Sequence, residues 1–277
     1  LVAGFVLVEI AAAVATGSLA LLGDAGHLLT DVAGLALALG AIEAAARSRV
    51  HPGRTFGLYR LEVLAALANA VLLLGLAAFI VVEAIERFRA PPQLSPGPMI
   101  VVASLAIVVN LVVVRLLRPG ARESLNLQGA FLEVLADLLS SVGVLVAGVV
   151  LATTGWAYID PIVAIGIGLW VLPRALRLGG QAIRILLQVA PEDLPPTEVR
   201  ATLEAVEGVD AVHELHVWSL TSGMEVVSAH LDVAAGADAR EVLDSAAGRL
   251  RQRHGVEHAT LQLDVGGSRT DCRELSW

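Results

Sequence analysis

The chain contains no lysine, and charged side chains of either sign are scarce. All 19 basic residues are arginine, Asp and Glu together number 27, and the net charge is −8 over 277 residues. Because the arginines gather in no basic patch or tail, the composition excludes nucleic acid as a partner. The single cysteine, Cys272, excludes an intramolecular disulfide and any zinc ribbon or redox motif that needs a pair of cysteines.

Apolar residues dominate the chain instead. They make up 56% of it, and the mean hydropathy is +0.74, as is typical of an integral protein of the lipid bilayer. A helix needs about 20 apolar residues to cross the hydrocarbon core. We expect six such spans, at residues 1–22, 25–46, 61–86, 98–117, 127–152 and 159–180. The first residue is not Met and already lies in an apolar run, so we also expect a preceding segment to be missing from this sequence.

The arginines indicate how these spans are oriented. Ten of them lie at ends that would share one side of the membrane: Arg47, Arg49, Arg54, Arg60, Arg115, Arg118, Arg122, Arg174, Arg177 and Arg184. Only Arg87 and Arg89 lie at the opposite ends of the spans. Cytoplasmic loops are enriched in basic residues, so this asymmetry predicts a protein of the plasma (inner) membrane with both termini in the cytoplasm.

Beyond residue 188 no segment is apolar enough to cross a membrane. Val199, Leu203 and Val206 repeat at helical spacing, and a second helical pattern runs up to Leu250. Strand-like alternation marks AVHELHVWSL, MEVVSAHLDV and HATLQLDV. The order αββαβ predicts a small ferredoxin-like α+β domain. We therefore expect a six-helix membrane bundle at residues 1–188 and a cytoplasmic domain at residues 189–277.

Two of the predicted spans each carry two ionisable side chains four residues apart. His27 and Asp31 lie in the second span, within GDAGHLLTDVAG, and Glu133 and Asp137 lie in the fifth. Inserting an ionisable side chain at the centre of a membrane helix costs about 2.5–3.5 kcal/mol, so we expect each pair to have a structural or functional role. Residues at i and i+4 share a helix face, and one imidazole with three carboxylates suits Zn²⁺, with Co²⁺, Cd²⁺, Mn²⁺ and Fe²⁺ as competitors. The alternative is two unrelated pairs that hydrogen-bond neighbouring helices.

These ligands suit a transporter better than an enzyme. Histidine and carboxylates bind metal only when deprotonated, so metal ions and protons compete for the same atoms, which is a basis for exchange. A catalytic zinc ion would need an open coordination position and a general base, and the spans contain no HExxH or comparable motif. The sequence gives no reason to expect an organic cofactor. A membrane-anchored metal sensor, in which residues 189–277 bind the metal, is the alternative function.

The chain also contains five longer motifs: SLALLGDAGHLLTDVAGLALALGA, FGLYRLEVLAALANAVLLL, LNLQGAFLEVLADLLSSVGVL, WAYIDPIVAIGIGLWVL and VHELHVWSLTSGMEVVSAHL. Together they resemble the cation diffusion facilitator family, most closely its bacterial cobalt-zinc-cadmium efflux branch, over nearly the whole chain. The resemblance implies a homodimer in which each protomer exchanges cytoplasmic Zn²⁺ for protons, with Cd²⁺ and Co²⁺ as alternative cargo. It also implies a cytoplasmic domain that binds regulatory metal and helps to hold the dimer.

Within the spans, the resemblance implies that His27, Asp31 and Asp137 are ligands of the transported metal. Glu133 stands where many zinc transporters of the family have histidine. A third carboxylate makes the site harder, which weakens selectivity for zinc over cadmium or cobalt. Asp24, one turn before His27, is expected to cap the helix or to accept a hydrogen bond from the imidazole.

In the cytoplasmic domain, the resemblance points to a second metal site. His213, His230 and Asp264 match metal positions of the family, with the two histidines on neighbouring predicted strands. His216 has the opposite strand parity to His213, so the two histidines can face the same side only if a bulge lies between them.

Overall fold

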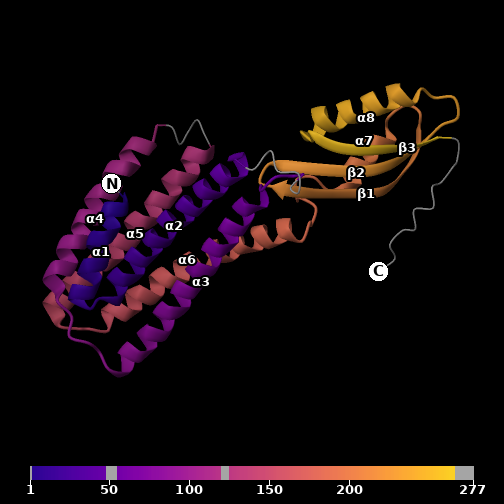
Figure 1. The fold of residues 1–277 in the computed structure, drawn as a ribbon. Coiled ribbons are helices and arrows are strands. Elements are labelled where there is room, and N and C mark those ends of the chain that lie inside the picture. The colour runs from indigo at the N-terminus through magenta and orange to yellow at the C-terminus, as the bar shows by residue number, and fades with distance from the viewer. Residues whose placement is uncertain (1, 48–54, 120–124, 266–277) are drawn as a thin grey trace. The chain divides into compact units, whose positions relative to one another are not determined.

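The structure, a computed structural model, describes residues 2–47, 55–119 and 125–265 (Figure 1). Contacts between residues divide the chain into two compact units. One comprises Leu1–Leu37 with Ala66–Gly179, and the other comprises Ala38–Ala65 with Gly180–Trp277. Four residues used above, Arg49, Arg54, Arg122 and Cys272, lie outside the described residues.

Six helices come first along the chain, as predicted. They are α1 (Val2–Thr16), α2 (Leu19–Arg47), α3 (Arg60–Arg89), α4 (Pro96–Leu117), α5 (Leu125–Thr154) and α6 (Ile159–Leu186). In the described part of the chain, α2 to α6 are long and apolar enough to cross a membrane, and α1 is a shorter apolar helix of 15 residues. The predicted six-helix bundle is therefore confirmed.

The break between the first two helices lies earlier than predicted. The chain turns at Gly17, which has a φ of 71° and donates its amide hydrogen to the carbonyl of Ala13. Glycine adopts this left-handed conformation without steric cost, so it ends α1. The Ser18 hydroxyl then accepts a hydrogen bond from the Leu21 amide, which caps the start of α2. The apolar residues before Asp24 therefore belong to α2, and His27 lies about two turns inside it.

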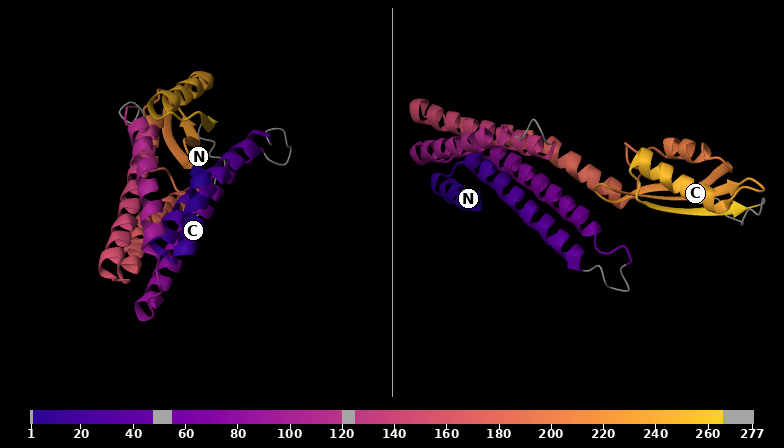
Figure 2. Two further views of the ribbon diagram at one scale, coloured as in Figure 1. Left: turned by 90° about the vertical axis from the view of Figure 1, so that its left-hand side faces the viewer. Right: turned by 90° about the horizontal axis from the view of Figure 1, so that it is seen from above.

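Small side chains fill the contacts between the helices. α4 and α5 lie side by side, and α1 packs against α4 (Figures 1 and 2). The main buried cluster contains Ala13, Leu19, Ala20, Leu21, Ile80, Ala84, Met99, Val102, Ala103, Val144, Ala147, Ala164 and Ile167. Its many alanines let the helix backbones approach closely. Large apolar residues such as Val101 and Trp170 are exposed instead, as expected of helix faces that meet lipid.

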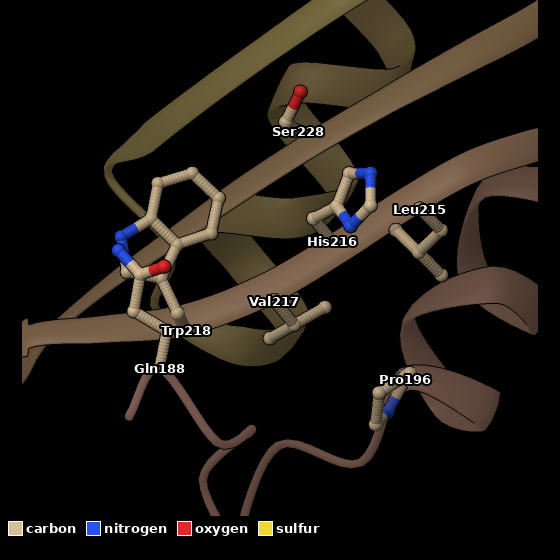
Figure 3. Close-up of a pocket in the computed structure, with 7 residues that line it drawn as sticks. All are labelled: Gln188, Pro196, Leu215, His216, Val217, Trp218 and Ser228. Carbon is tan, nitrogen blue, oxygen red and sulfur yellow. The ribbon is translucent and has the colours of Figure 1, made fainter. Parts of the chain in front are cut away.

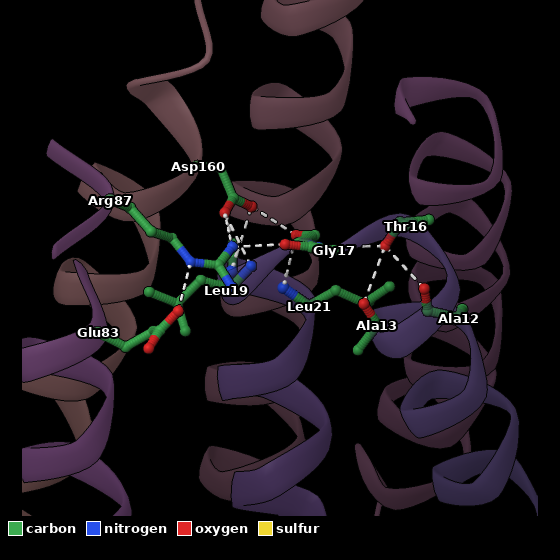
Figure 4. A network of polar contacts seen from close by, with 11 residues as sticks. Ala12, Ala13, Thr16, Gly17, Leu19, Leu21, Glu83, Arg87 and Asp160 are labelled. Carbon is green, nitrogen blue, oxygen red and sulfur yellow. Dashed lines mark hydrogen bonds and ion pairs between the residues drawn. The ribbon is translucent and has the colours of Figure 1, made fainter. Parts of the chain in front are cut away.

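A buried carboxylate from α6 fixes the start of α2 (Figure 4). Asp160 is fully buried and accepts hydrogen bonds from the Ser18 hydroxyl at 2.5 Å and from the Leu19 amide at 2.8 Å. Arg87 of α3 lies 3.5 Å from the same carboxylate and donates a hydrogen bond to the carbonyl of Gly17. Negative charge is favourable at a helix N-terminus. The network therefore ties α2, α3 and α6 together.

The C-terminal part has the predicted αββαβ order: α7 (Pro196–Glu204), β1 (Val209–Thr221), β2 (Met224–Val233), α8 (Ala239–His254) and β3 (His258–Val265). The strands form one sheet in the order β1-β2-β3, with β1 and β2 antiparallel and β2 and β3 parallel. Leu203 of α7, Leu250 of α8 and Leu231 of β2 belong to one buried core. The predicted α+β fold class is confirmed.

Candidate metal centres

Three of the four ionisable residues predicted as ligands in the spans lie together. His27 and Asp31 are one turn apart on α2, and Asp137 comes from α5. His27 Nε2 is 3.5 Å from Asp31 Oδ2 and 3.6 Å from Asp137 Oδ1. One ligand atom from each residue lies within 4.8 Å of the other two. His27 and Asp137 are buried and Asp31 is partly buried, so the group lies inside the bundle.

Several atoms of this group find no hydrogen-bond partner among the described residues. They are Nδ1 of His27 and the Oδ1 atoms of Asp31 and Asp137. Buried polar atoms in folded proteins are nearly always hydrogen-bonded, so each exception needs an explanation. One imidazole and two carboxylates are a donor set suited to a divalent transition-metal ion. The geometry thus fits a metal site better than a network of structural hydrogen bonds.

The fourth predicted ligand, Glu133, has a different neighbour. Its Oε1 atom is 2.5 Å from Nη2 of Arg174 on α6, and the same nitrogen is 3.6 Å from Asp31 Oδ1. Within the described ranges, Glu133 is not among the side chains whose ligand atoms cluster within 4.8 Å. Its role as a ligand stays a prediction. From the sequence, Arg174 is only a marker of membrane orientation, because spacing along one helix does not show which carboxylates it contacts.

Asp24 lies inside α2, so the expectation that it caps the helix is wrong. It is 2% exposed and accepts hydrogen bonds from the hydroxyls of Ser140 and Ser141 on α5. The Ser141 hydroxyl also contacts the main-chain carbonyl of Asp137 at 2.9 Å. Because Asp24 is one turn from His27, and Ser141 one turn from Asp137, these contacts align α2 with α5 beside the metal group. Sequence reasoning missed both serines.

A second group of metal-type side chains lies on the sheet of the C-terminal domain. His213 of β1 pairs directly with His230 of β2, and Asp264 lies on β3. Asp264 Oδ2 is 3.4 Å from His213 Nε2 and 3.6 Å from His230 Nδ1, and one ligand atom from each residue lies within 4.8 Å of the others. Asp232 Oδ1 is 3.3 Å from His213 Nε2. Sequence reasoning missed Asp232, which pairs with Asp264 in the strand register.

His216 lies outside this second group. The pairing of β1 with β2 shifts between His213 and His216, and Glu214 between them has a φ of 47°. A bulge of the kind that could turn both histidines to one side is therefore present. The His216 side chain is nevertheless 62% exposed and contacts Glu214 at 3.3 Å. It lines a pocket of about 490 Å³ together with Trp218 and Gln188 (Figure 3).

Two family models match the chain. The one described as the cation efflux transmembrane domain matches residues 1–187, which include α1 to α6 and the first metal group. The one described as the cytoplasmic domain of cation efflux proteins matches residues 191–265, which include the sheet and the second group.

Curated relatives cover most of the chain. The metal cation efflux system protein CzcD of Cupriavidus metallidurans is 43% identical over 94% of this chain and 83% of its own length. The cadmium, cobalt and zinc/H(+)-K(+) antiporter of Bacillus subtilis is 34% identical over 96% of this chain and 86% of its own. The zinc transporter ZitB of Escherichia coli is 39% identical over 95% of this chain and 84% of its own length. A solved structure, the metal-bound C-terminal domain of the CzcD transporter from Cupriavidus metallidurans, is 30% identical with a TM-score of 0.24, and the match covers 24% of this chain and 94% of that one.

Proposed function

The chain belongs to the cation efflux family and is a divalent metal cation efflux transporter, and on this basis we propose that it exports Zn²⁺ from the cytoplasm in exchange for protons. Relatives named for zinc transport and for the antiport of cadmium, cobalt and zinc support this cargo, with Cd²⁺ and Co²⁺ as the alternatives. The family match of the membrane helices disfavours a sensor in which those helices are only an anchor.

The observation that carries the proposal is the group formed by His27, Asp31 and Asp137 between α2 and α5. We assign these side chains as ligands of the cargo, with Glu133 as the fourth. Each of them binds metal only after losing its proton, so an incoming metal ion displaces protons and incoming protons displace the metal. The same atoms then serve both ions, and the exchange needs no separate proton site.

The proposal extends to the orientation and the assembly of the chain. The asymmetry of the arginines supports termini that face the cytoplasm, which makes residues 189–277 a cytoplasmic domain. We assign His213, His230 and Asp264 there as a regulatory metal site, supported by their clustering. A homodimer held in part by this domain follows from the family resemblance.

The test uses the purified full-length chain in proteoliposomes that contain a zinc-sensitive dye, with a second dye to follow pH. Zinc added outside should enter, and protons should move the opposite way. Asp31→Ala should abolish both fluxes. The matched control is Glu43→Ala, which removes a carboxylate of the same helix whose side chain is 60% exposed. Transport by Asp31→Ala at the wild-type rate would refute the site, and zinc uptake without opposing proton movement would refute the antiport.

A further inference from the structure

A guanidinium group contacts the proposed transport site. Nη2 of Arg174 lies 2.5 Å from Glu133 Oε1 and 3.6 Å from Asp31 Oδ1, so a single nitrogen bridges carboxylates of α5 and α2. Arginine cannot lose its proton in a protein, and its contacts with carboxylates are stronger than neutral hydrogen bonds. Arg174 is therefore a permanent positive charge beside two of the proposed ligands.

Asp31 is shared between this arginine and the metal group. Its Oδ1 atom faces Arg174, while its Oδ2 atom lies 3.5 Å from His27 Nε2. The Oδ1 atom is buried and makes no hydrogen bond to the described residues, so at 3.6 Å the attraction to Arg174 is one of charge. The metal ligands and the arginine thus form one electrostatic unit.

Counting the formal charges of the carboxylates, His27 and the metal ion shows how Arg174 changes the net charge of the site. Three carboxylates carry three negative charges when ionised, and His27 adds none in the neutral form that binds metal. A divalent ion alone would leave one negative charge uncompensated, which is unfavourable beside the mostly buried carboxylates of Asp31 and Asp137. Arg174 supplies the remaining positive charge. The buried carboxyls of Glu9 and Asp24 form no ion pair with Arg174 among the described residues, so the arginine compensates Glu133 and Asp31 and not these two groups.

We propose that Arg174 is the counter-ion of the transport site: it compensates the carboxylate of Glu133, so that the loaded site carries no net charge and can release its metal. The inference rests on the transport site proposed above. Metal affinity rises with the number of charged ligands, so three uncompensated carboxylates would hold the cargo more tightly and release it more slowly. The Glu133–Arg174 pair therefore gives the site the net charge that a neutral ligand at position 133 would give.

A surface arginine without a specific partner is the alternative. Arg177, which lies about one turn further along α6, is exposed and provides the comparison. Both residues carry the same charge on the same helix, but Arg174 is the one that contacts Glu133 and Asp31. Neutralising each arginine in turn separates a local counter-charge from a general effect of surface charge.

The test measures zinc transport by the full-length chain in proteoliposomes for Arg174→Gln, Glu133→Gln, the double variant and Arg177→Gln. Arg174→Gln should lower KM roughly tenfold and also lower kcat, because the metal binds more tightly and leaves more slowly. Glu133→Gln should raise KM by about the same factor. The double variant removes both charges together, so its KM should return to within about threefold of the wild-type value.

The outcomes separate this inference from the proposed function. Arg177→Gln should leave both constants unchanged. An unchanged or higher KM in Arg174→Gln, or a double variant with a KM as far from wild type as that of Glu133→Gln, overturns the counter-ion role. Asp137→Ala is measured alongside: if it transports normally, the transport site itself is wrong, whatever the arginine variants do.

Discussion

The carboxylates of Asp31 and Asp137 come from different helices, and their ligand atoms lie within 4.8 Å of each other. Two ionised carboxylates this close repel each other in a partly desolvated site, and a cation or a proton relieves the repulsion. His27 lies 3.5 Å from the first and 3.6 Å from the second, so an imidazole that binds either ion is part of the same group. This arrangement supports the proposed competition between metal and protons.

The apparent affinity for zinc should therefore fall as the pH falls, with the pH kept equal on both sides of the membrane. Protons occupy His27 and the carboxylates in place of the metal, so KM should rise by up to about tenfold per pH unit for each proton displaced. The measurement is initial zinc uptake into proteoliposomes from about pH 8 down to about pH 6. His27→Asn, which removes one competing group, should show a shallower rise. A wild-type KM that stays constant over this range contradicts the competition.

Asp160 should be essential for the stability of the bundle rather than for the exchange itself. Asp160→Ala leaves the Arg87 guanidinium and the Leu19 amide without their buried acceptor. Arg87 keeps Glu83 at 3.0 Å, so the main cost comes from the buried donors left without an acceptor, about 1–3 kcal/mol each. Thermal unfolding of the purified protein in detergent should therefore occur at a clearly lower temperature than for the wild type. Glu83→Gln is the control: it contacts the same arginine, but its side chain is 32% exposed, and its loss should cost less than about 1 kcal/mol.

Local patterns sufficed to predict the helices and strands, because apolar runs and alternation depend on neighbouring residues. The start of α2 depends on more than that. Ser18 caps the helix locally, but Asp160, which accepts a hydrogen bond from the Leu19 amide, lies 141 residues further along the chain. A single sequence does not show that such a distant carboxylate reaches a helix end. The sequence therefore predicts the break at residues 23–24, after the apolar run, whereas the chain turns at Gly17.

In the candidate sites, too, local spacing predicts some features, whereas others depend on contacts between distant parts of the chain. Helical spacing was enough to place His27 and Asp31 on one face, because i and i+4 are neighbours on any helix. The contact of Arg174 with Glu133 depends on how α6 packs against α5, and the contact of Asp232 with His213 depends on strand register. Packing and register are properties of the folded chain. Residues that act on a site from another element were accordingly the ones that sequence reasoning missed.

Zinc binding by the C-terminal domain should depend on His213 and not on His216. His213 contacts both Asp232 and Asp264, whereas the exposed side chain of His216 contacts Glu214. Replacing a metal ligand should weaken this site at least about 100-fold, while replacing His216 removes no ligand of the group.

The measurement is a zinc titration of the full-length chain in detergent. The chain also carries Asp31→Ala, so that the transport site does not contribute to the bound zinc. His213→Ala should lose the remaining tightly bound zinc, and His216→Ala should retain it. The reverse pattern would place the metal at the bulge beside the pocket of His216, because that histidine and Glu214 are the metal-type side chains in contact there. Because the side chain of His213 is 26% exposed and that of His216 is 62% exposed, thermal unfolding of both variants checks that the difference reports on the metal and not on the fold.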